Sequence, residues 1–164
     1  TTAEQAKSII EPLKENRAEL RRRMNAALGA FQSQAAVKLH CIGACGFCFG
    51  GTAVLELARS GADMKAFASL HGGLDSPTPA DANNILGSVL VLHGVLDPSV
   101  SCEQEDAFID EIGAAEVDWQ LMNFGQAGHS FTDPEARRPG FYYHAQTALR
   151  ASLALRNFFA EMLG

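Results

Sequence analysis

The sequence predicts an α/β fold, because short apolar runs alternate with helical segments along most of its length. Three such runs, at residues 37–44, 65–70 and 88–93, are each followed by a turn signal or a helical pattern. A fourth run covers residues 117–124 and precedes a long closing helix. Alternation of this kind is typical of a parallel sheet that helices cover on both faces.

Composition indicates an ordinary globular chain of 164 residues, 47% hydrophobic and 20% charged, and no linker-like stretch divides it. We therefore expect a single domain over residues 1–164, with a helical lead-in at 1–34 and a sheet core at 37–164. The formal net charge of −6 argues against nucleic acid or an anionic membrane as a partner. No transmembrane stretch or signal peptide is seen and four cysteines do not resemble a disulfide framework, so a cytoplasmic location is expected.

Capping-box pairs predict two helix starts near the beginning of the chain, at Thr2 with Gln5 and at Asn16 with Glu19. Pro12 lacks a backbone donor, which predicts that the first helix ends near residue 10 and that a second covers 17–31. Further helical patterns cover residues 52–59, 103–112 and about 141–163. Prolines in the segment 72–87 predict a surface loop.

Cys48 lies just after the first predicted strand and just before a predicted helix. Gly46 and Gly50 flank it in a G-x-C-x-G pattern, which suits a sharp strand-to-helix turn where side chains leave little room. A thiol at a helix N-terminus is more readily ionised, because the helix dipole favours an anion. The backbone N–H of Phe49, the next residue, is the expected donor to an oxyanion. The pattern predicts that Cys48 is a nucleophile.

A nucleophile of this kind needs a base and an acid that orients the base, and both are expected on later loops. Asp97 follows the run at 88–93, and His129 follows the run at 117–124. All three residues fall at carboxyl ends of predicted strands, where ligands of parallel sheets gather. We therefore expect a Cys48–His129–Asp97 triad, with Asp97 alternatively only initiating a turn and His129 alternatively an ordinary loop residue.

Three cysteines also allow an iron–sulfur interpretation, since Cys41, Cys45 and Cys48 have the spacing of a radical-type cluster. An extended strand would hold the first two sulfurs too far from the third, and the interpretation leaves the acid and the histidine without a role. A Cys45–Cys48 redox pair is a further alternative. We expect instead that Cys41, Cys45 and Cys102 pack as small apolar core residues, and we expect no metal.

Several segments together resemble the dienelactone hydrolase family: Gly46-Phe47-Cys48-Phe49-Gly50-Gly51, Ser69-Leu70-His71-Gly72-Gly73, Val91-Leu92-His93-Gly94, Asp97-Pro98 and Gly128-His129-Ser130-Phe131. The resemblance implies an α/β-hydrolase fold with a triad at Cys48, His129 and Asp97. It also implies hydrolysis of a small-molecule ester or lactone without a metal or organic cofactor.

Two departures from the family pattern limit what the resemblance implies. Family members have further strands ahead of this region, which supply a second oxyanion donor and a glutamate linked to thiol activation, and nothing in residues 1–34 matches them. No arginine follows His129 directly to hold a substrate carboxylate. The natural substrate is therefore not implied by the family name, and a non-catalytic remnant that serves as a binding or assembly module is the alternative to a hydrolase.

Overall fold

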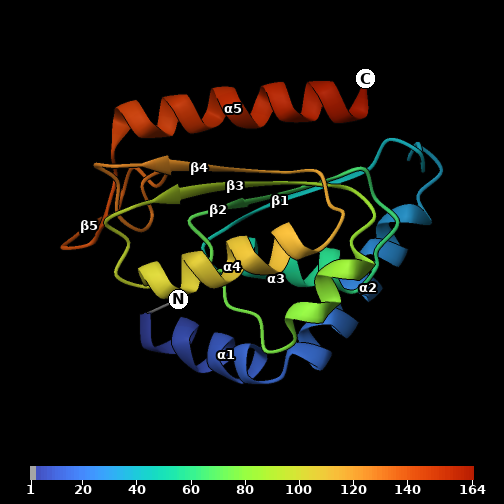
Figure 1. Cartoon of the computed structure of the whole chain (residues 1–164), viewed down its shortest axis with the longest axis horizontal. Helices are drawn as coiled ribbons and strands as arrows, with labels where there is room; N and C mark the ends of the chain where they lie inside the picture. Colours follow the sequence, from blue (N-terminus) through green and yellow to red (C-terminus); the bar gives the residue numbers. More distant parts are fainter. Residues whose placement is uncertain (1–2) are drawn as a thin grey trace.

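A computed structural model describes residues 3–164 and confirms the α/β class, with a four-stranded parallel sheet flanked by helices (Figure 1). Its strands, adjacent in the order given, are β1 (Gly43–Phe47), β2 (Ala66–Leu70), β3 (Ser88–Gly94) and β4 (Trp119–Phe124). The helices are α1 (Ala3–Glu15), α2 (Arg17–Gln32), α3 (Phe49–Arg59), the 3₁₀ helix η1 (Pro79–Asn84), α4 (Cys102–Ala114) and α5 (Ala145–Leu163). A two-stranded antiparallel hairpin, β5 (Arg137–Arg138) and β6 (Phe141–Tyr142), precedes α5.

The sheet separates two hydrophobic cores of unequal size. Helix α5 alone covers one face, while α2, α3 and α4 lie on the other (Figure 1). Side chains alternate along each strand, so Phe67 and Val89 point into the larger core and Ala68 and Leu90 into the core under α5. All five residues of β2 are buried, because this strand has a neighbour on each side and helices on both faces.

The parallel arrangement brings the carboxyl ends of all four strands to one edge of the sheet. In register, Phe47 at the end of β1 pairs with Leu70 of β2, which pairs with Leu92 of β3. The loops that leave these strand ends therefore begin side by side, although they are far apart in the sequence.

The opening helix differs from the sequence prediction. Helix α1 continues past Pro12 to Glu15, whereas an end near residue 10 was predicted. Pro12 is exposed, and its carbonyl accepts a hydrogen bond from the N–H of Asn16 at 3.1 Å. The proline thus removes one donor from a solvent-facing turn without ending the helix. The cap at Asn16 is confirmed, since its side chain accepts from the N–H of Glu19, whereas the cap expected at Thr2 lies outside the described residues.

The first predicted strand was misplaced. Residues 37–41 form an irregular loop with a turn at 39–40, and β1 covers Gly43–Phe47, where the backbone pairs in register with β2. The prediction followed apolar residues, but β1 lies at the edge of the sheet and includes two glycines. Residues 141–144, predicted as helix, instead contain β6 and the N-cap of α5, and the 72–87 loop contains η1.

The expectation that the three other cysteines lie in the core is also wrong. Cys41 is half-buried, while Cys45 and Cys102 are exposed. The strand β1 approaches α5 at Gly43, where an added Cβ would lie 2.6 Å from Phe159. Cys45 lies two residues further along the edge strand, and Cys102 lies in the solvent-facing first turn of α4.

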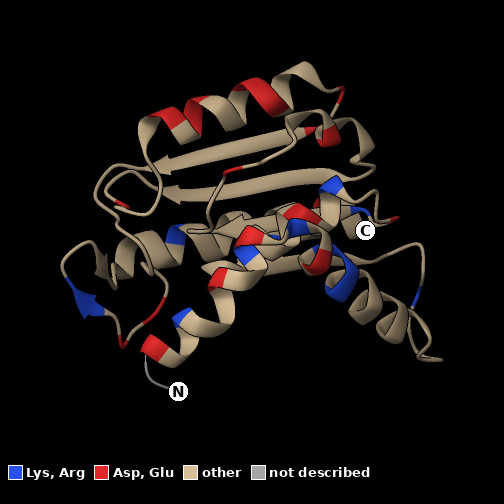
Figure 2. Ribbon diagram, turned by 90° about the horizontal axis from the view of Figure 1, so that it is seen from below, with Lys and Arg blue, Asp and Glu red and all other residues tan. Residues whose placement is uncertain are grey.

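Charged residues are unevenly distributed over the helical side of the molecule. Figure 2 shows that α4 carries only acidic charged residues, whereas β5 consists of two arginines. Among the described residues, no helix combines the length and the apolar character that a membrane span requires.

Candidate active site

Cys48 occupies the turn between β1 and α3, where the sequence placed it. It is the N-cap of α3 and has φ 54° and ψ −125°, a left-handed backbone conformation that is unusual for a residue with a side chain. Its N–H donates to the carbonyl of Leu70 on β2 at 3.0 Å, and its carbonyl accepts from the N–H of Gly51 at 2.9 Å. These bonds hold the sulfur at the helix N-terminus, above the end of the sheet.

The glycines around this turn have different roles. A Cβ at Gly46 would lie 2.0 Å from the carbonyl oxygen of Gly50, and a Cβ at Gly51 would lie 2.4 Å from the hydroxyl oxygen of Ser69. A Cβ at Gly50 would meet nothing within 4 Å. Position 46 therefore requires glycine as expected. On the other side of Cys48, it is position 51 rather than position 50 that the packing restricts.

His129 lies on the loop after β4, as the sequence predicted. The β5–β6 hairpin holds this loop from both sides. The N–H of His129 donates to the carbonyl of Gly140 at 2.7 Å, and its carbonyl accepts from the N–H of Tyr142 at 3.0 Å. The ring of Phe141 lies 5.1 Å from the His129 ring. The backbone of the histidine is thus fixed by a short hairpin that the sequence did not predict.

Asp97 lies on the loop after β3 and is buried, with 3% of its surface exposed. Its Oδ1 accepts a hydrogen bond from the N–H of Ser99 at 2.8 Å, which fixes the carboxylate in an Asx turn. This loop lies directly against the histidine loop, since a Cβ at Gly94 would lie 2.6 Å from the carbonyl oxygen of Ala127.

The three side chains converge at the edge of the sheet. His129 Nε2 lies 2.9 Å from Cys48 Sγ, and His129 Nδ1 lies 2.7 Å from Asp97 Oδ2. The imidazole thus bridges the thiol and the carboxylate, and Nδ1–H donates to Asp97. A chain of thiol, imidazole and carboxylate is the arrangement that activates a nucleophile by an oriented base.

The contacts shift the proton affinities of all three groups. The hydrogen bond from His129 lowers the pKa of the Cys48 thiol against the opposing effect of burial. Burial alone would lower the pKa of His129, but its bonds to Asp97 and Cys48 raise that pKa to about 9. Burial would raise the pKa of Asp97, yet its bonds to His129 and Ser99 keep that pKa below its usual value. The site therefore favours a thiolate beside an imidazolium.

Phe49, the expected oxyanion donor, is the first residue of α3. Its backbone N–H interacts with the Cys48 sulfur closely enough to lower the thiol pKa. It therefore lies beside the atom that would attack a carbonyl, as the predicted role requires.

A cavity of about 690 Å³ adjoins Cys48 and His129. Helix α1 forms one of its sides, a role that the sequence did not indicate for the helical lead-in. The 15 lining residues are Ala6, Lys7, Ile10, Glu11, Lys14, Cys48, Phe49, Thr52, Gly73, Asp75, Ser99, Gln104, His129, Arg138 and Phe141. The four-residue spacing of Ala6, Ile10 and Lys14 was a signal that they share a face, but it carried no information on what that face covers.

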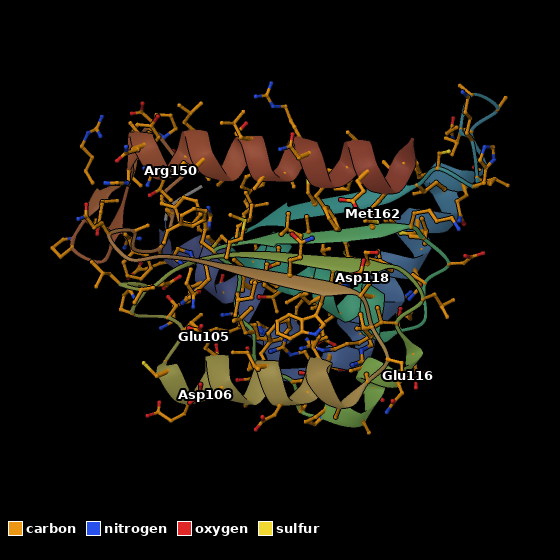
Figure 3. The ribbon with its side chains drawn as sticks, turned by 45° about the horizontal axis from the view of Figure 1, so that its top comes forward. Glu105, Asp106, Glu116, Asp118, Arg150 and Met162 are labelled. Carbon is orange, nitrogen blue, oxygen red and sulfur yellow. The ribbon has the colours of Figure 1, made fainter. Side chains whose placement is uncertain are left out.

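The histidines at the ends of the middle strands do not line this cavity. The ring of His71 accepts a hydrogen bond at 3.2 Å from the N–H of Cys48, which is the same N–H that donates to the carbonyl of Leu70. His93 is buried, and its Nε2 lies 3.8 Å from a carboxylate oxygen of Glu105 on α4. Figure 3 shows Glu105 on the side of α4 toward the sheet, where it also accepts from Asn123.

The competing candidates lie away from the site or lack partners in it. Two other acidic residues that follow β3 in the chain, Asp106 and Asp110, are exposed on α4 (Figure 3 labels Asp106). Within residues 3–164, no group of three or more His, Cys, Asp or Glu side chains is arranged to hold a metal ion. The cysteines of the iron–sulfur interpretation are therefore not brought together with one another in the way that a cluster requires.

Comparisons with known proteins show what this chain is similar to. The sequence pattern of the dienelactone hydrolase family matches residues 1–163. An uncharacterized protein of Caenorhabditis elegans, K02A2.1, is 37% identical over 149 residues, which are 87% of this chain and 94% of the worm protein.

Two solved structures have the same arrangement of elements. A protein called m3DLH is 43% identical and superposes with a TM-score of 0.93, over 98% of this chain and 68% of m3DLH. The dienelactone hydrolase-like promiscuous phosphotriesterase P91, from metagenomic libraries, is 42% identical with a TM-score of 0.92, over 99% of this chain and 69% of P91. About a third of each solved chain thus has no counterpart here.

Proposed function

The chain belongs to the dienelactone hydrolase family, and on this basis we propose that it hydrolyses small carboxylic esters or lactones through Cys48, His129 and Asp97. One observation carries the proposal. A thiol, an imidazole and a buried carboxylate from three separate loops form a hydrogen-bonded chain beside a cavity that suits a small molecule.

In the proposed first half-reaction, the Cys48 thiolate attacks the substrate carbonyl carbon and forms a carbon–sulfur bond. The carbonyl electron pair moves to oxygen, which the N–H of Phe49 stabilises. When this intermediate collapses, the carbon–oxygen ester bond breaks, and the departing alkoxide takes the proton from His129 Nε2. The product of this half-reaction is a thioester on Cys48 and a free hydroxyl group.

In the second half-reaction, water attacks the thioester carbon while His129 Nε2 accepts its proton. The tetrahedral intermediate collapses, the carbon–sulfur bond breaks and the carboxylic acid is released. Asp97 keeps the imidazole in the tautomer with Nδ1–H and stabilises its charged form in both steps. The chemistry requires no metal or organic cofactor.

Phosphotriesters are a second candidate substrate class. The observation in favour is that P91, 42% identical over 99% of this chain, is described as a promiscuous phosphotriesterase. The same thiolate would then attack phosphorus instead of carbon. Both candidates place the covalent bond on Cys48, so one set of variants tests them together.

The test compares p-nitrophenyl acetate, an aromatic lactone and an aryl dialkyl phosphate as substrates for the wild type, Cys48→Ala and Cys45→Ala. Cys45 is the matched control, since it is an exposed cysteine three residues away. We expect Cys48→Ala to lose roughly 10³-fold or more in kcat/KM on every accepted substrate. Cys45→Ala should retain the wild-type values, and acid-quenched wild type should carry one acyl group on the Cys48 peptide by mass spectrometry.

Full activity of Cys48→Ala on these substrates would contradict the proposal. If the wild type accepts no substrate and iodoacetamide labels Cys48 no faster than Cys45, the alternative of a non-catalytic binding module is supported instead. The ratio of the ester to the phosphotriester rate decides between the two substrate classes.

A further inference from the structure

His71 is the buried titratable residue next to the triad that the proposed reaction does not use. It follows β2 at the edge where the triad lies and is 3% exposed. Its φ of 40° falls in the left-handed region, as do those of Cys48 (54°) and Ser130 (59°), and the described chain has no other non-glycine residue there. Such conformations cost about 1–3 kcal/mol each and persist only where the surroundings hold them.

The hydrogen bonds of the His71 ring determine its tautomer. Nδ1 lies 3.2 Å from the backbone nitrogen of Cys48 and must accept, because a backbone N–H is only a donor. The proton of the neutral ring is therefore on Nε2, which lies 2.8 Å from Oγ1 of Thr132 and donates to it. The ring thus has one fixed direction of donation, from the Cys48 turn through His71 to Thr132.

The hydrogen bonds of His71 connect three segments that are far apart in the sequence: the strand β3, the turn of Cys48 and the loop that follows His129. The N–H of His71 donates to the carbonyl of Leu92 on β3 at 2.9 Å, which fixes the residue on the sheet. Its ring joins the turn of Cys48 to Thr132, three residues after His129. The His71 ring also meets the His129 ring edge-on, with centroids 5.2 Å apart.

We infer that His71 is a positioning residue: its neutral imidazole bridges the Cys48 backbone to Thr132 and so sets the separation of the Cys48 sulfur and the His129 imidazole. The inference rests on the proposed reaction of that pair. His71 does not line the cavity, so its effect is exerted through the two loops that it connects and through the edge-on contact of its ring with that of His129.

The surroundings keep the ring in the form that the bridge needs. Burial, and after it the charge of His129, lower the pKa of His71 to about 4. A protonated ring would present a second N–H to the N–H of Cys48, and the bond would be lost. The bridge is therefore complete at neutral pH.

The first test uses Thr132, which does not have the positive φ of its neighbour Ser130. Thr132→Val has nearly the same shape and removes only the acceptor for Nε2–H, while Thr132→Ser keeps the hydroxyl and is the matched control. We expect Thr132→Val to lose about 2- to 10-fold in kcat, the size of one neutral hydrogen bond, with little change in KM. Thr132→Ser should remain within about twofold of the wild type.

The second test changes the ring itself. His71→Leu removes both bonds, and we expect a loss of about 10- to 100-fold in kcat, because the sulfur and the base are no longer held in register. His71→Asn tolerates a positive φ and still offers an oxygen to the N–H of Cys48, so it should fall between Leu and the wild type. Circular dichroism and the urea midpoint show which variants are folded at the assay temperature.

A second readout separates positioning from stability. The alkylation rate of the Cys48 peptide by iodoacetamide, followed against pH by mass spectrometry, gives the thiol pKa. This pKa should rise in His71→Leu and in Thr132→Val but not in Thr132→Ser, because the bond from His129 is what lowers it. A merely structural residue would lower the urea midpoint and leave the thiol pKa of the folded protein unchanged.

The outcomes distinguish the two proposals. Wild-type hydrolysis through Cys48, with kcat and thiol pKa unchanged in Thr132→Val and in folded His71 variants, overturns the inference and leaves the proposed function. If the thiol pKa rises in these variants but the wild type hydrolyses no ester, the bridge is supported and the proposed function is overturned. If His71→Leu does not fold, the Thr132 pair still decides.

Discussion

Two clusters of ionisable side chains lie at opposite ends of helix α3, and they differ in whether a proton can move between their members. At its N-terminus, Cys48 meets His129, which in turn meets Asp97. Near its C-terminus, Arg59 donates two bonds to Glu111, at 2.7 and 2.8 Å, and one to Glu56 at 3.0 Å. Both clusters are built from ionisable groups, and both are held by loops or helices from distant parts of the chain.

In the cluster at Arg59, each nitrogen of the guanidinium donates to a protein acceptor. Arg59 is 1% exposed and also donates to the carbonyl of Leu74, while Glu56 accepts a further bond from Arg21 of α2 at 2.7 Å. Helices α2, α3 and α4 are thereby joined through fixed charges. The triad, in contrast, contains a thiol that adjoins a cavity and a backbone in the left-handed region.

The difference indicates which buried polar groups mark an active site. Burial and ion pairing occur in both clusters, so neither identifies the site. What distinguishes the triad is a thiol with a lowered pKa beside an imidazole with a raised pKa, next to a cavity and on a strained turn. Glu56 and Arg59 have no such access, and their pairing is expected to serve stability.

The largest effect that separates the clusters is expected from Asp97→Asn. This variant keeps the shape of the carboxylate but favours the wrong imidazole tautomer, so kcat on an activated ester should fall by up to about 10⁴-fold. Its free energy of unfolding should change far less than its activity. Steady-state kinetics and urea unfolding of the same samples give both numbers.

Asp106→Asn is the matched control for this prediction, since it makes the same change at an exposed position on α4 (Figure 3). It should keep wild-type kinetics. If Asp97→Asn lost stability but kept its activity, the two clusters would be alike in function, and the triad assignment would fail.

The opposite pattern is expected from Arg59→Met. This variant leaves the carboxylates of Glu111 and Glu56 buried with fewer partners, which should cost about 3–5 kcal/mol in free energy of unfolding. The catalytic constant of the folded protein should stay near that of the wild type, because α3 has 11 residues and its two ends lie about 16 Å apart.

Two variants sharpen the test of this network. Arg150→Met removes an exposed arginine from α5, on the other face of the sheet, and should leave stability unchanged (Figure 3). Arg59→Met with Glu111→Leu removes both partners and should recover part of the lost stability, because no uncompensated charge remains at position 111. A double variant less stable than Arg59→Met would show that the pair itself stabilises the fold.

The same contrast explains how much of the fold the sequence predicts. Strands β2 and β3 were placed to within a residue, since they are buried on both sides and their apolar runs are continuous. Strand β1 was misplaced because an edge strand with two glycines is defined by backbone pairing with β2, and its side chains carry little signal. Helix α1 was cut short because the cost of Pro12 is small where the helix faces solvent.

The candidate site was predicted in its main residues but not in its supports. Cys48, Asp97 and His129 each follow a strand, so sheet topology alone brings them to one edge. The bond from His71 to the Cys48 backbone, the hairpin that holds His129 and the α1 side of the cavity depend on three-dimensional contacts between distant segments. Even at the turn, sequence spacing favoured Gly50, while packing restricts Gly51.

The smallest effect concerns how the triad couples stability to pH. The lowered pKa of Cys48 stabilises the folded state above the ordinary value of 9.0, and this contribution is lost as the pH falls through the folded value. The raised pKa of His129 stabilises it below the ordinary value of 6.5, and this contribution is lost as the pH rises through about 9. Where the pH lies above both 6.5 and the folded pKa of Cys48, and below about 9, the folded pair holds one proton, on His129, and the unfolded pair also holds one, on Cys48.

Because the proton counts are equal, the pair should add no pH dependence to wild-type stability in that pH interval. In Cys48→Ala only His129 remains, its pKa still raised by Asp97, so its stabilisation should decline as the pH rises from 6.5. The difference in free energy of unfolding, wild type minus Cys48→Ala, should therefore grow with pH in urea titrations under reducing conditions. Cys45→Ala should show a constant difference, and a constant difference for Cys48→Ala as well would mean that the thiol and the imidazole do not share a proton.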